Sequence, residues 1–293
     1  MKTKNKFFSR LSTIFAITLF IGNTAFAQVD DSTATISKPK KDTRPVKDPF
    51  ESGYILNNQT IIVPTANTLE MAIQHRFGKL NSKDFDLGGL YAPSNIRIGL
   101  SYSITDDILI GAGTTKNNKL QDLNWKYVIL RQTRSGNIPI NITYFGDATI
   151  DVRKEVFPKF TNRLSYFHQL IFARKFNKSV SLQIAPSYSH FNMVDSLLKW
   201  DDFAISASGR VKVTNALAVI FEYNYLLTKQ PEAIISVKPG VSLGIEAVTS
   251  GHAFQIFIGS LDGLNNQYDI LNKNDFLKKE VLIGFNITRL WSF

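Results

Sequence analysis

Apolar and polar residues alternate along many short segments, and this alternation limits the possible folds more than any other feature of the chain. In segment 95–104, Ile, Leu or Tyr occupies every second position, and Arg, Gly or Ser stands between them. Segments 180–188 and 203–213 follow a similar pattern, and no convincing helical periodicity appears. A period of two places successive side chains on opposite faces of a β-strand. The pattern therefore predicts an all-β fold.

The composition of the second face separates two kinds of β-fold. The water-exposed face of a soluble sandwich carries Lys, Glu and Thr freely, whereas here the second face is mostly Ser, Gly, Ala, Asn and Gln. The apolar face is rich in aromatic residues, and the chain contains 22 Phe, 10 Tyr and 3 Trp. Apolar residues toward lipid and polar residues toward a lumen are typical of a transmembrane antiparallel β-barrel. Closure of the barrel gives every backbone polar group a partner within lipid.

The lengths of the connections support the same fold. Short turns alternate with long connections, as in outer-membrane barrels, where periplasmic turns are tight and outward loops are long. This alternation predicts about twelve strands with both ends of the barrel on the periplasmic side. We expect strands near 68–77, 95–104, 108–115, 123–132, 138–146, 163–175, 179–189, 202–213, 216–227, 240–249, 252–260 and 280–293. Segment 59–64 fits either a short extra strand or an inward-folded segment.

The first part of the chain has the features of an export signal. Basic residues precede the apolar stretch "LSTIFAITLFI", and "AFA" at 25–27 fits a cleavage site. We expect residues 1–27 to be a signal peptide, with an N-terminal membrane anchor as the alternative. Residues 28–53 are rich in Ser, Thr, Pro and Lys and predict a disordered periplasmic arm. Residues 54–293 then form the barrel, located in the cell outer membrane in contact with its lipids.

Charge and cysteine content exclude several classes of function. The formal charge of +10 falls to +6 without residues 1–27, because that stretch contains four basic residues and no acidic one. This modest excess predicts no nucleic-acid partner. The chain contains no cysteine, which excludes disulfides and thiolate metal sites. No histidine pair has metal-ligand spacing and no nucleotide-binding motif precedes a helix, so we expect no metal and no cofactor.

Three stretches resemble a known family. These are "TLEMAIQHRFGKL", "NIRIGLSYSITDDILIGAGTTKNNKLQDLNWKYVILRQ" and "PINITYFGD". The most specific pieces are residues 75–78, 96–100 and 126–132. They resemble the exported β-barrel family of Gram-negative bacteria catalogued as domain of unknown function 5777, over roughly residues 50–293. The resemblance implies a barrel fold and an outer-membrane location, and it carries no catalytic residue.

Charged residues at inward-facing positions are the strongest functional candidates. Ionisable groups are costly on a lipid-facing wall, so the alternation directs them into the lumen. They either line a narrow water-filled path and set its charge preference, or pair across the interior and fill it. The predicted lumen-facing charges are Glu70, Arg76, Arg97, Lys126, Arg210, Lys212, Glu222 and Glu246.

The last predicted strand suggests a role in assembly. Trp291 and Phe293 lie on its apolar face, and a C-terminal aromatic residue resembles the signal that the barrel assembly machinery recognises. Gly284 departs from the usual glycine position of that signal. Arg289 falls on the lipid face, where its charge can reach the headgroups.

The sequence favours a passive or weakly selective pore for small polar solutes. The alternative is a non-conducting barrel that serves as a scaffold or docks a periplasmic protein through the basic arm at 38–47. An outer-membrane lipid hydrolase ranks last. His168 is the candidate for that chemistry, and it lacks the nucleophile and orienting partner that covalent catalysis needs. We therefore expect no enzymatic activity.

Overall fold

The computed structural model describes residues 42–47, 49–80, 89, 91–153, 156–194 and 197–293. The predicted signal peptide at 1–27, and the part of the predicted arm before residue 42, lie outside these residues. Within the described residues, no helix is long and apolar enough to cross a membrane.

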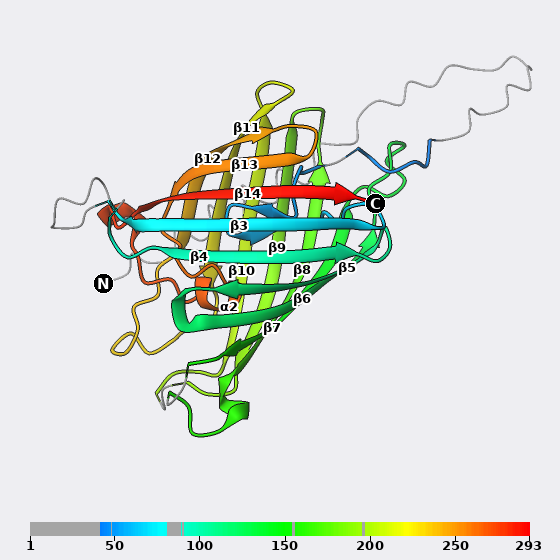
Figure 1. The fold of residues 1–293 in the computed structure, drawn as a ribbon. Helices are drawn as coiled ribbons and strands as arrows, with labels where there is room; N and C mark the ends of the chain where they lie inside the picture. Colours follow the sequence, from blue (N-terminus) through cyan, green and yellow to red (C-terminus); the bar gives the residue numbers. More distant parts are fainter. Residues whose placement is uncertain (1–41, 48, 81–88, 90, 154–155, 195–196) are drawn as a thin grey trace, which may run out of the picture. The chain divides into compact units, whose positions relative to one another are not determined.

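Twelve antiparallel strands form a closed barrel (Figure 1), which confirms the predicted fold class and strand number. Each strand pairs with its neighbours in the sequence, and the last strand pairs with the first. The strands are β3 (Thr68–Lys79), β4 (Asn95–Ser103), β5 (Ile108–Thr115), β6 (Leu120–Leu130), β7 (Asn141–Asp151), β8 (Leu164–Lys175), β9 (Val180–Phe191), β10 (Asp201–Lys212), β11 (Leu217–Leu226), β12 (Gly240–Val248), β13 (His252–Gly259) and β14 (Leu282–Ser292).

Two strands differ noticeably from their predicted bounds. β6 begins at Leu120 rather than near 123, and β7 spans Asn141–Asp151 rather than 138–146. The residues added at the start of β6 pair with those added at the end of β7, and Leu120 lies opposite Asp151. Residues 120–122 look like a polar connection in the sequence. Asp122 is nevertheless an inward-facing strand residue whose charge is paired inside the barrel.

The barrel closes between β14 and β3. Their register runs from Leu282 opposite Lys79 to Ser292 opposite Thr68, with one irregularity near Gly284. The backbone N–H of Phe293 donates to the carbonyl of Asn67 at 3.0 Å. This pairing removes both sheet edges, which otherwise expose unpaired backbone groups.

The two ends of the barrel have different connections. The turns between β4 and β5, β6 and β7, β8 and β9, β10 and β11, and β12 and β13 all lie at one end, which we call the short-turn end. β3 starts and β14 finishes at this end. The remaining connections lie at the opposite, long-connection end. Three of them contain 3-10 turns, at Asn117–Lys119, Phe160–Arg163 and Phe276–Lys278.

A separate segment occupies the interior of the barrel. We call residues 49–64 the luminal segment, and it contains a two-stranded hairpin of β1 (Tyr54–Ile55) and β2 (Asn58–Gln59). Figure 1 shows this segment in blue behind β14 and β3. Leu56 turns the hairpin with a positive φ of 58° and is fully buried. Segment 59–64, left open by the sequence, is thus an inward-folded segment whose first residue belongs to β2.

The luminal segment starts earlier than the predicted barrel. Phe50 and Ser52 fall in the predicted disordered arm, yet both side chains are buried inside the barrel. Alternation does not reveal such a segment, because barrel wall surrounds it and its side chains are buried without a period of two.

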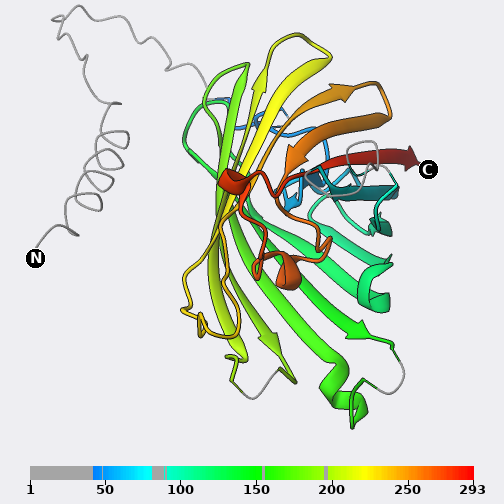
Figure 2. The ribbon, with the colours of Figure 1, turned by 90° about the vertical axis from the view of Figure 1, so that its left-hand side faces the viewer.

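The connection between β13 and β14 enters the interior from the other end. It contains the short helix α2 (Asn266–Asp269), which Figure 2 shows within the opening of the barrel. Gln267 and Asp269 of α2 are buried. The interior is therefore occupied from both ends.

Candidate functional site: the occupied lumen

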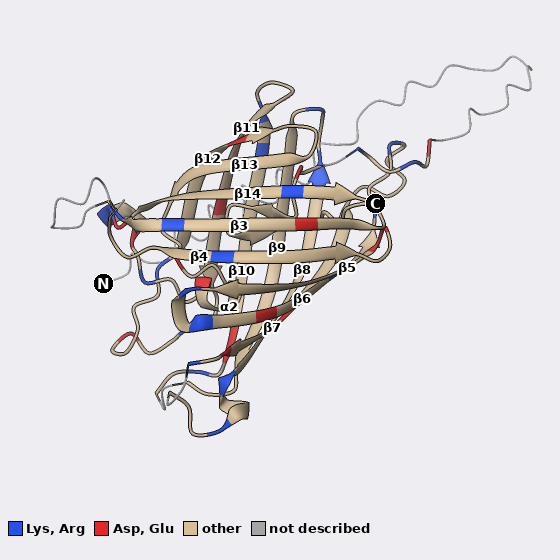
Figure 3. Ribbon diagram, in the orientation of Figure 1, with Lys and Arg blue, Asp and Glu red and all other residues tan. Residues whose placement is uncertain are grey.

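The structure places the predicted lumen-facing charges on the inward-facing side of the wall. Glu70, Arg76, Arg97, Lys126, Arg210, Glu222 and Glu246 are all buried. Lys212 is partly exposed near the end of β10. Figure 3 shows basic and acidic positions distributed over several strands of the wall. Most of these groups contact the luminal segment or pair with one another.

Two wall charges of opposite sign hold one asparagine of the hairpin. Arg76 Nε and Nη2 donate to Asn57 Oδ1 at 3.0 and 2.7 Å. The backbone N–H of Asn57 donates to Glu222 Oε2 at 2.9 Å, and Asn57 Nδ2 donates to Glu222 Oε1 at 2.5 Å. The amide thus gives each buried charge a hydrogen-bonding partner, and hydrogen bonds to charged groups are stronger than those between neutral groups.

Wall amides satisfy the backbone of the hairpin. Gln255 Oε1 accepts from the Leu56 N–H at 3.0 Å, and Gln255 Nε2 donates to the Tyr54 carbonyl at 3.0 Å. Asn286 Nδ2 donates to the Leu56 carbonyl at 2.7 Å. A two-stranded hairpin leaves backbone groups unpaired, and buried groups of this kind need partners. The inward-facing amides of β13 and β14 supply them.

The opposite wall holds the ends of the hairpin. Lys126 Nζ donates to the Gly53 carbonyl at 2.8 Å, and Gln183 Nε2 donates to the Gln59 carbonyl at 2.7 Å. A Cβ atom on Gly53 would lie 2.7 Å from Glu70 Oε1. Only glycine therefore lets the chain approach the Glu70 carboxylate this closely without a shift of one of them.

Apolar contacts add to these polar ones. Phe50, Ile55, Leu56 and Ile61 of the luminal segment belong to one buried cluster with side chains of the wall. The wall contributes Phe145, Phe167, Ile171, Ile220 and Phe257, together with two alanines, all at positions that the alternation assigns to the lumen. Large apolar residues at inward positions are out of place in a water-filled lumen. They were the sequence signal that could have predicted an inward-folded segment.

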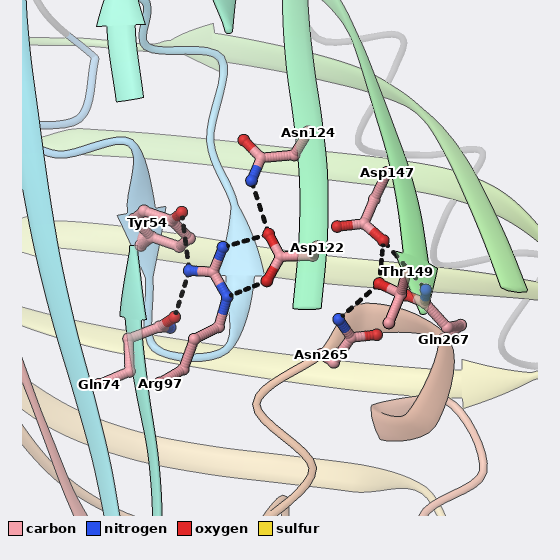
Figure 4. A network of polar contacts seen from close by, with 9 residues as sticks. All are labelled: Tyr54, Gln74, Arg97, Asp122, Asn124, Asp147, Thr149, Asn265 and Gln267. Atoms are coloured by element: carbon pink, nitrogen blue, oxygen red, sulfur yellow. Dashed lines mark hydrogen bonds and ion pairs between the residues drawn. The ribbon is translucent and has the colours of Figure 1, made fainter. Parts of the chain in front are cut away.

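A bidentate ion pair lies beside the hairpin (Figure 4). Arg97 Nε and Nη2 donate to the two carboxylate oxygens of Asp122 at 2.9 and 2.6 Å. Arg97 Nη1 also donates to Tyr54 Oη and Gln74 Oε1, both at 3.3 Å. The pair joins β4 to β6 across β5 and sets the position of the tyrosine that begins the hairpin.

A second ion pair lies on the far wall. Arg210 Nε donates to Glu246 Oε2 at 2.5 Å, and Arg210 Nη2 lies 3.2 Å from Glu51 Oε1 of the luminal segment. Of the two interpretations of the inward charges, pairing that fills the interior describes this state of the protein.

The α2 connection is bound to the wall through amide side chains. Gln267 Nε2 donates to Asp147 Oδ1 at 3.0 Å, and Asn265 Nδ2 donates to Thr149 Oγ1 at 3.0 Å (Figure 4). Asp269 Oδ1 accepts from the Gly263 N–H at 2.9 Å. Burial raises the pKa of the Asp269 carboxyl to about 8, and the positive charge of Arg76 opposes that rise only in part.

The remaining space is uneven along the barrel. A cavity of about 530 Å³, which we call the vestibule, lies at the short-turn end. The luminal segment, β3, β14 and the β12–β13 turn line it, with Glu70 among the lining residues. Between the luminal segment and the α2 connection, a second space lined by Tyr54, Arg97 and Asn265 measures only about 10 Å³. That volume is about that of one water probe, so this space is too small for a larger solute.

The other residues singled out from the sequence lie away from the lumen. His168 stacks between the rings of Tyr144 and Tyr188, and its Nδ1 lies 2.7 Å from Tyr144 Oη. Trp291 lies on the outward face of β14 under the Arg289 guanidinium, whose carbon is 4.8 Å from the ring centroid. Within the described ranges, no group of three or more His, Cys, Asp or Glu residues could hold a metal ion.

The sequence pattern does not indicate the neutral partners of the lumen charges. Gln255, Asn286 and Gln183 stand at inward positions of their strands, where the alternation indicates only a polar lining. Asn57 lies in a segment without periodicity, so no pattern assigned its side chain to a wall charge.

The chain has low similarity to known proteins. No curated protein matches the chain in sequence. The KdgM porin is 8% identical with a TM-score of 0.46, covering 77% of this chain and 99% of its own. The NanC porin is 7% identical with a TM-score of 0.46 and the same coverages. The COG4313 outer membrane channel from Pseudomonas putida F1 is 9% identical with a TM-score of 0.47, covering 78% of this chain and 97% of its own.

These identities and TM-scores are low, so the assignment rests on a family model. The model described as "Membrane bound beta barrel domain (DUF5777)" matches residues 50–291. The match includes the luminal segment from Phe50 onward, the twelve strands and the α2 connection. The chain therefore belongs to the DUF5777 family of membrane-bound β-barrel domains.

Proposed function

We propose that this protein is an outer-membrane pore for small polar solutes, and that the luminal segment is its gate. One observation carries the proposal. The lumen is filled by a segment that precedes the wall in the sequence and pairs with no strand of it, while the wall is complete without that segment. The hairpin can therefore leave without opening a sheet edge.

The lining of the wall supports this interpretation. The side chains that hold the hairpin are Arg, Lys, Glu, Asn and Gln, and water can replace each of their bonds when the segment leaves. A typical intramolecular hydrogen bond contributes only about 1 kcal/mol net for this reason. A wall of about twelve strands also encloses a lumen of intermediate width between the smallest barrels and the porins.

The closed state is the resting state in this proposal. Opening exposes the apolar residues that the segment and the wall bury against each other. Full burial of one large apolar side chain contributes roughly 1.5–3 kcal/mol. Four such side chains in the segment keep the open fraction small until something outside the barrel shifts the balance.

The location and orientation are part of the same proposal. The signal peptide exports the chain, and the barrel assembly machinery inserts the barrel into outer-membrane lipids. Tight turns face the periplasm in barrels of this kind. The short-turn end, the vestibule and the entry of the luminal segment then face the periplasm, whereas the α2 connection faces outward.

Liposome swelling tests the pore directly. The full-length protein is reconstituted and the liposomes are placed in isosmotic solutions of neutral polar solutes of increasing size. The double variant Leu56→Ala/Asn57→Ala should swell the liposomes faster than wild type, and more slowly for larger solutes. If liposomes with the wild-type protein and liposomes with the double variant both swell at the rate of protein-free liposomes, the result would contradict the proposal.

A further inference from the structure

The buried carboxylates of the wall bear on which solutes use the path. We propose that the open path takes cationic solutes in preference to anionic ones, and that Glu70, which lines the vestibule, is its cation-binding site. This inference rests on the proposed pore and adds the class of solute.

Buried acidic residues outnumber buried basic ones on the described wall. The acidic residues are Glu70, Asp122, Asp147, Asp151, Asp202, Glu222 and Glu246, and the basic residues are Arg76, Arg97, Lys126 and Arg210. Lys175 and Lys212 are only partly exposed to solvent and lie at the short-turn rim, where salt screens them. The buried interior therefore has a negative balance.

Several of these charges cancel in pairs. Arg97 pairs with Asp122, and Arg210 pairs with Glu246. Asp151 pairs with the partly exposed Arg153 beside it. Four wall carboxylates remain against Arg76 and Lys126, so the excess of negative charge persists after pairing. Low-dielectric walls concentrate the field of such an excess within a narrow lumen.

Two of the unpaired carboxylates each have one oxygen atom to which no described residue donates a hydrogen bond. Glu70 Oε2 and Asp202 Oδ2 are buried and have no hydrogen-bond partner among the described residues. Buried carboxylate oxygens normally have partners, since an unsatisfied one is costly. Among the described residues, the ammonium of Lys126 donates to Gly53, and Arg76 and Arg97 make several bonds each. Arg210 Nη2 also has no hydrogen-bond partner among the described residues, but it lies 3.2 Å from Glu51 Oε1. The two carboxylate oxygens without a donor suit a cation.

The two carboxylates lie toward opposite ends of the path. Glu70 is near the start of β3 and lines the vestibule, which has room for a small organic ion. Asp202 is near the start of β10, toward the long-connection end. A cation entering from either side therefore meets a carboxylate that no protein donor fully occupies. Rings and pairs of carboxylates at the mouths of a pore favour cations in this way.

Reversal potentials in planar bilayers test the inference. For the opened variant Leu56→Ala/Asn57→Ala in a KCl gradient, the sign of the reversal potential should show a preference for cations. Adding Glu70→Gln and Asp202→Asn should move the reversal potential toward zero. Adding Glu232→Gln, a neutralised acid on the exposed β11–β12 connection, should leave it unchanged. Anion preference, or no shift with the lumen variants, would overturn the inference.

A second measurement is independent of conduction. Saturation-transfer NMR of wild-type protein in detergent should show tetramethylammonium bound in the vestibule and acetate not bound. Glu70→Gln should abolish the tetramethylammonium signal. Equal signals in wild type and Glu70→Gln would refute Glu70 as the site even if conduction is cation-selective. Silent bilayers with a Glu70-dependent signal would instead contradict the pore and leave the binding site standing.

Discussion

At the scale of single residues, closure depends on what the hairpin presents to the wall. Leu56 is fully buried at the turn of the hairpin, within the apolar cluster. Leu56→Ala should weaken closure by about 2–5 kcal/mol, the usual cost of a truncated core leucine. Single-channel recording should show a higher open probability. Val213→Ala, at an exposed position near the short-turn end, should not change it. An unchanged open probability for Leu56→Ala would contradict the role of the hairpin.

Asn57 allows a separate test of the polar contacts. Asn57→Ala leaves Arg76 and Glu222 without their shared partner in a buried site. An unsatisfied buried group costs about 1–3 kcal/mol, and more when it is charged. The open probability should rise while the folded barrel persists, since the strands keep their own pairing. The exposed control Asn117→Ala should behave as wild type. An equal effect of the two variants would argue against a specific role of the Asn57 hydrogen bonds in closure.

The sequence predicted the charges of this site but not their partners. Alternation assigned Arg76 and Glu222 to the lumen because strand residues two apart share a face. It could not assign Asn57, whose position depends on long-range contacts of a segment that has no period. The same limit explains Phe50 and Ser52, which have the composition of a linker and become buried only because the barrel surrounds them.

At the scale of elements, the α2 connection should loosen as the pH rises. An exposed aspartate titrates near pH 4, and burial raises the pKa of Asp269 to about 8. The packed connection therefore binds the proton more tightly than the released one, so packing loses stability as the pH rises from about 4 to about 8. Hydrogen exchange of residues 261–281 should be slowest, relative to the intrinsic rate, at the acidic end of this window.

Asp269→Asn is the matched control for that titration. The variant cannot ionise, so protection of the connection should no longer change over this pH range. A pH dependence that survives the substitution, or protection that increases with pH, would contradict the assignment to Asp269.

The strands show which element bounds a pattern can give. Strand β5 lies where the alternation placed it, because both of its faces are clear and the chain turns tightly before it. β6 extends beyond its predicted start because Asp122 looks like a connection residue until its pairing with Arg97 is known. Element number and type follow from local pattern, whereas bounds at a charged end depend on a partner from another strand.

At the scale of the whole molecule, closure between β14 and β3 makes the wall continuous. A barrel whose strands all pair should resist unfolding by detergent at room temperature and unfold on heating. The folded protein should therefore migrate differently on a denaturing gel before and after boiling. Identical migration under both conditions would count against a closed barrel.

A reversible covalent lock between the luminal segment and the wall shows whether the segment closes the pore. Ser52 Oγ of the segment lies 2.9 Å from Thr288 Oγ1 of β14, and the chain has no cysteine of its own. A Ser52→Cys/Thr288→Cys variant that also carries Leu56→Ala should be silent in planar bilayers when oxidised and should conduct after reduction. The two controls, each with a single cysteine and Leu56→Ala, should conduct under both oxidising and reducing conditions. Equal conductance of the oxidised and reduced double variant would contradict closure of the pore by the luminal segment.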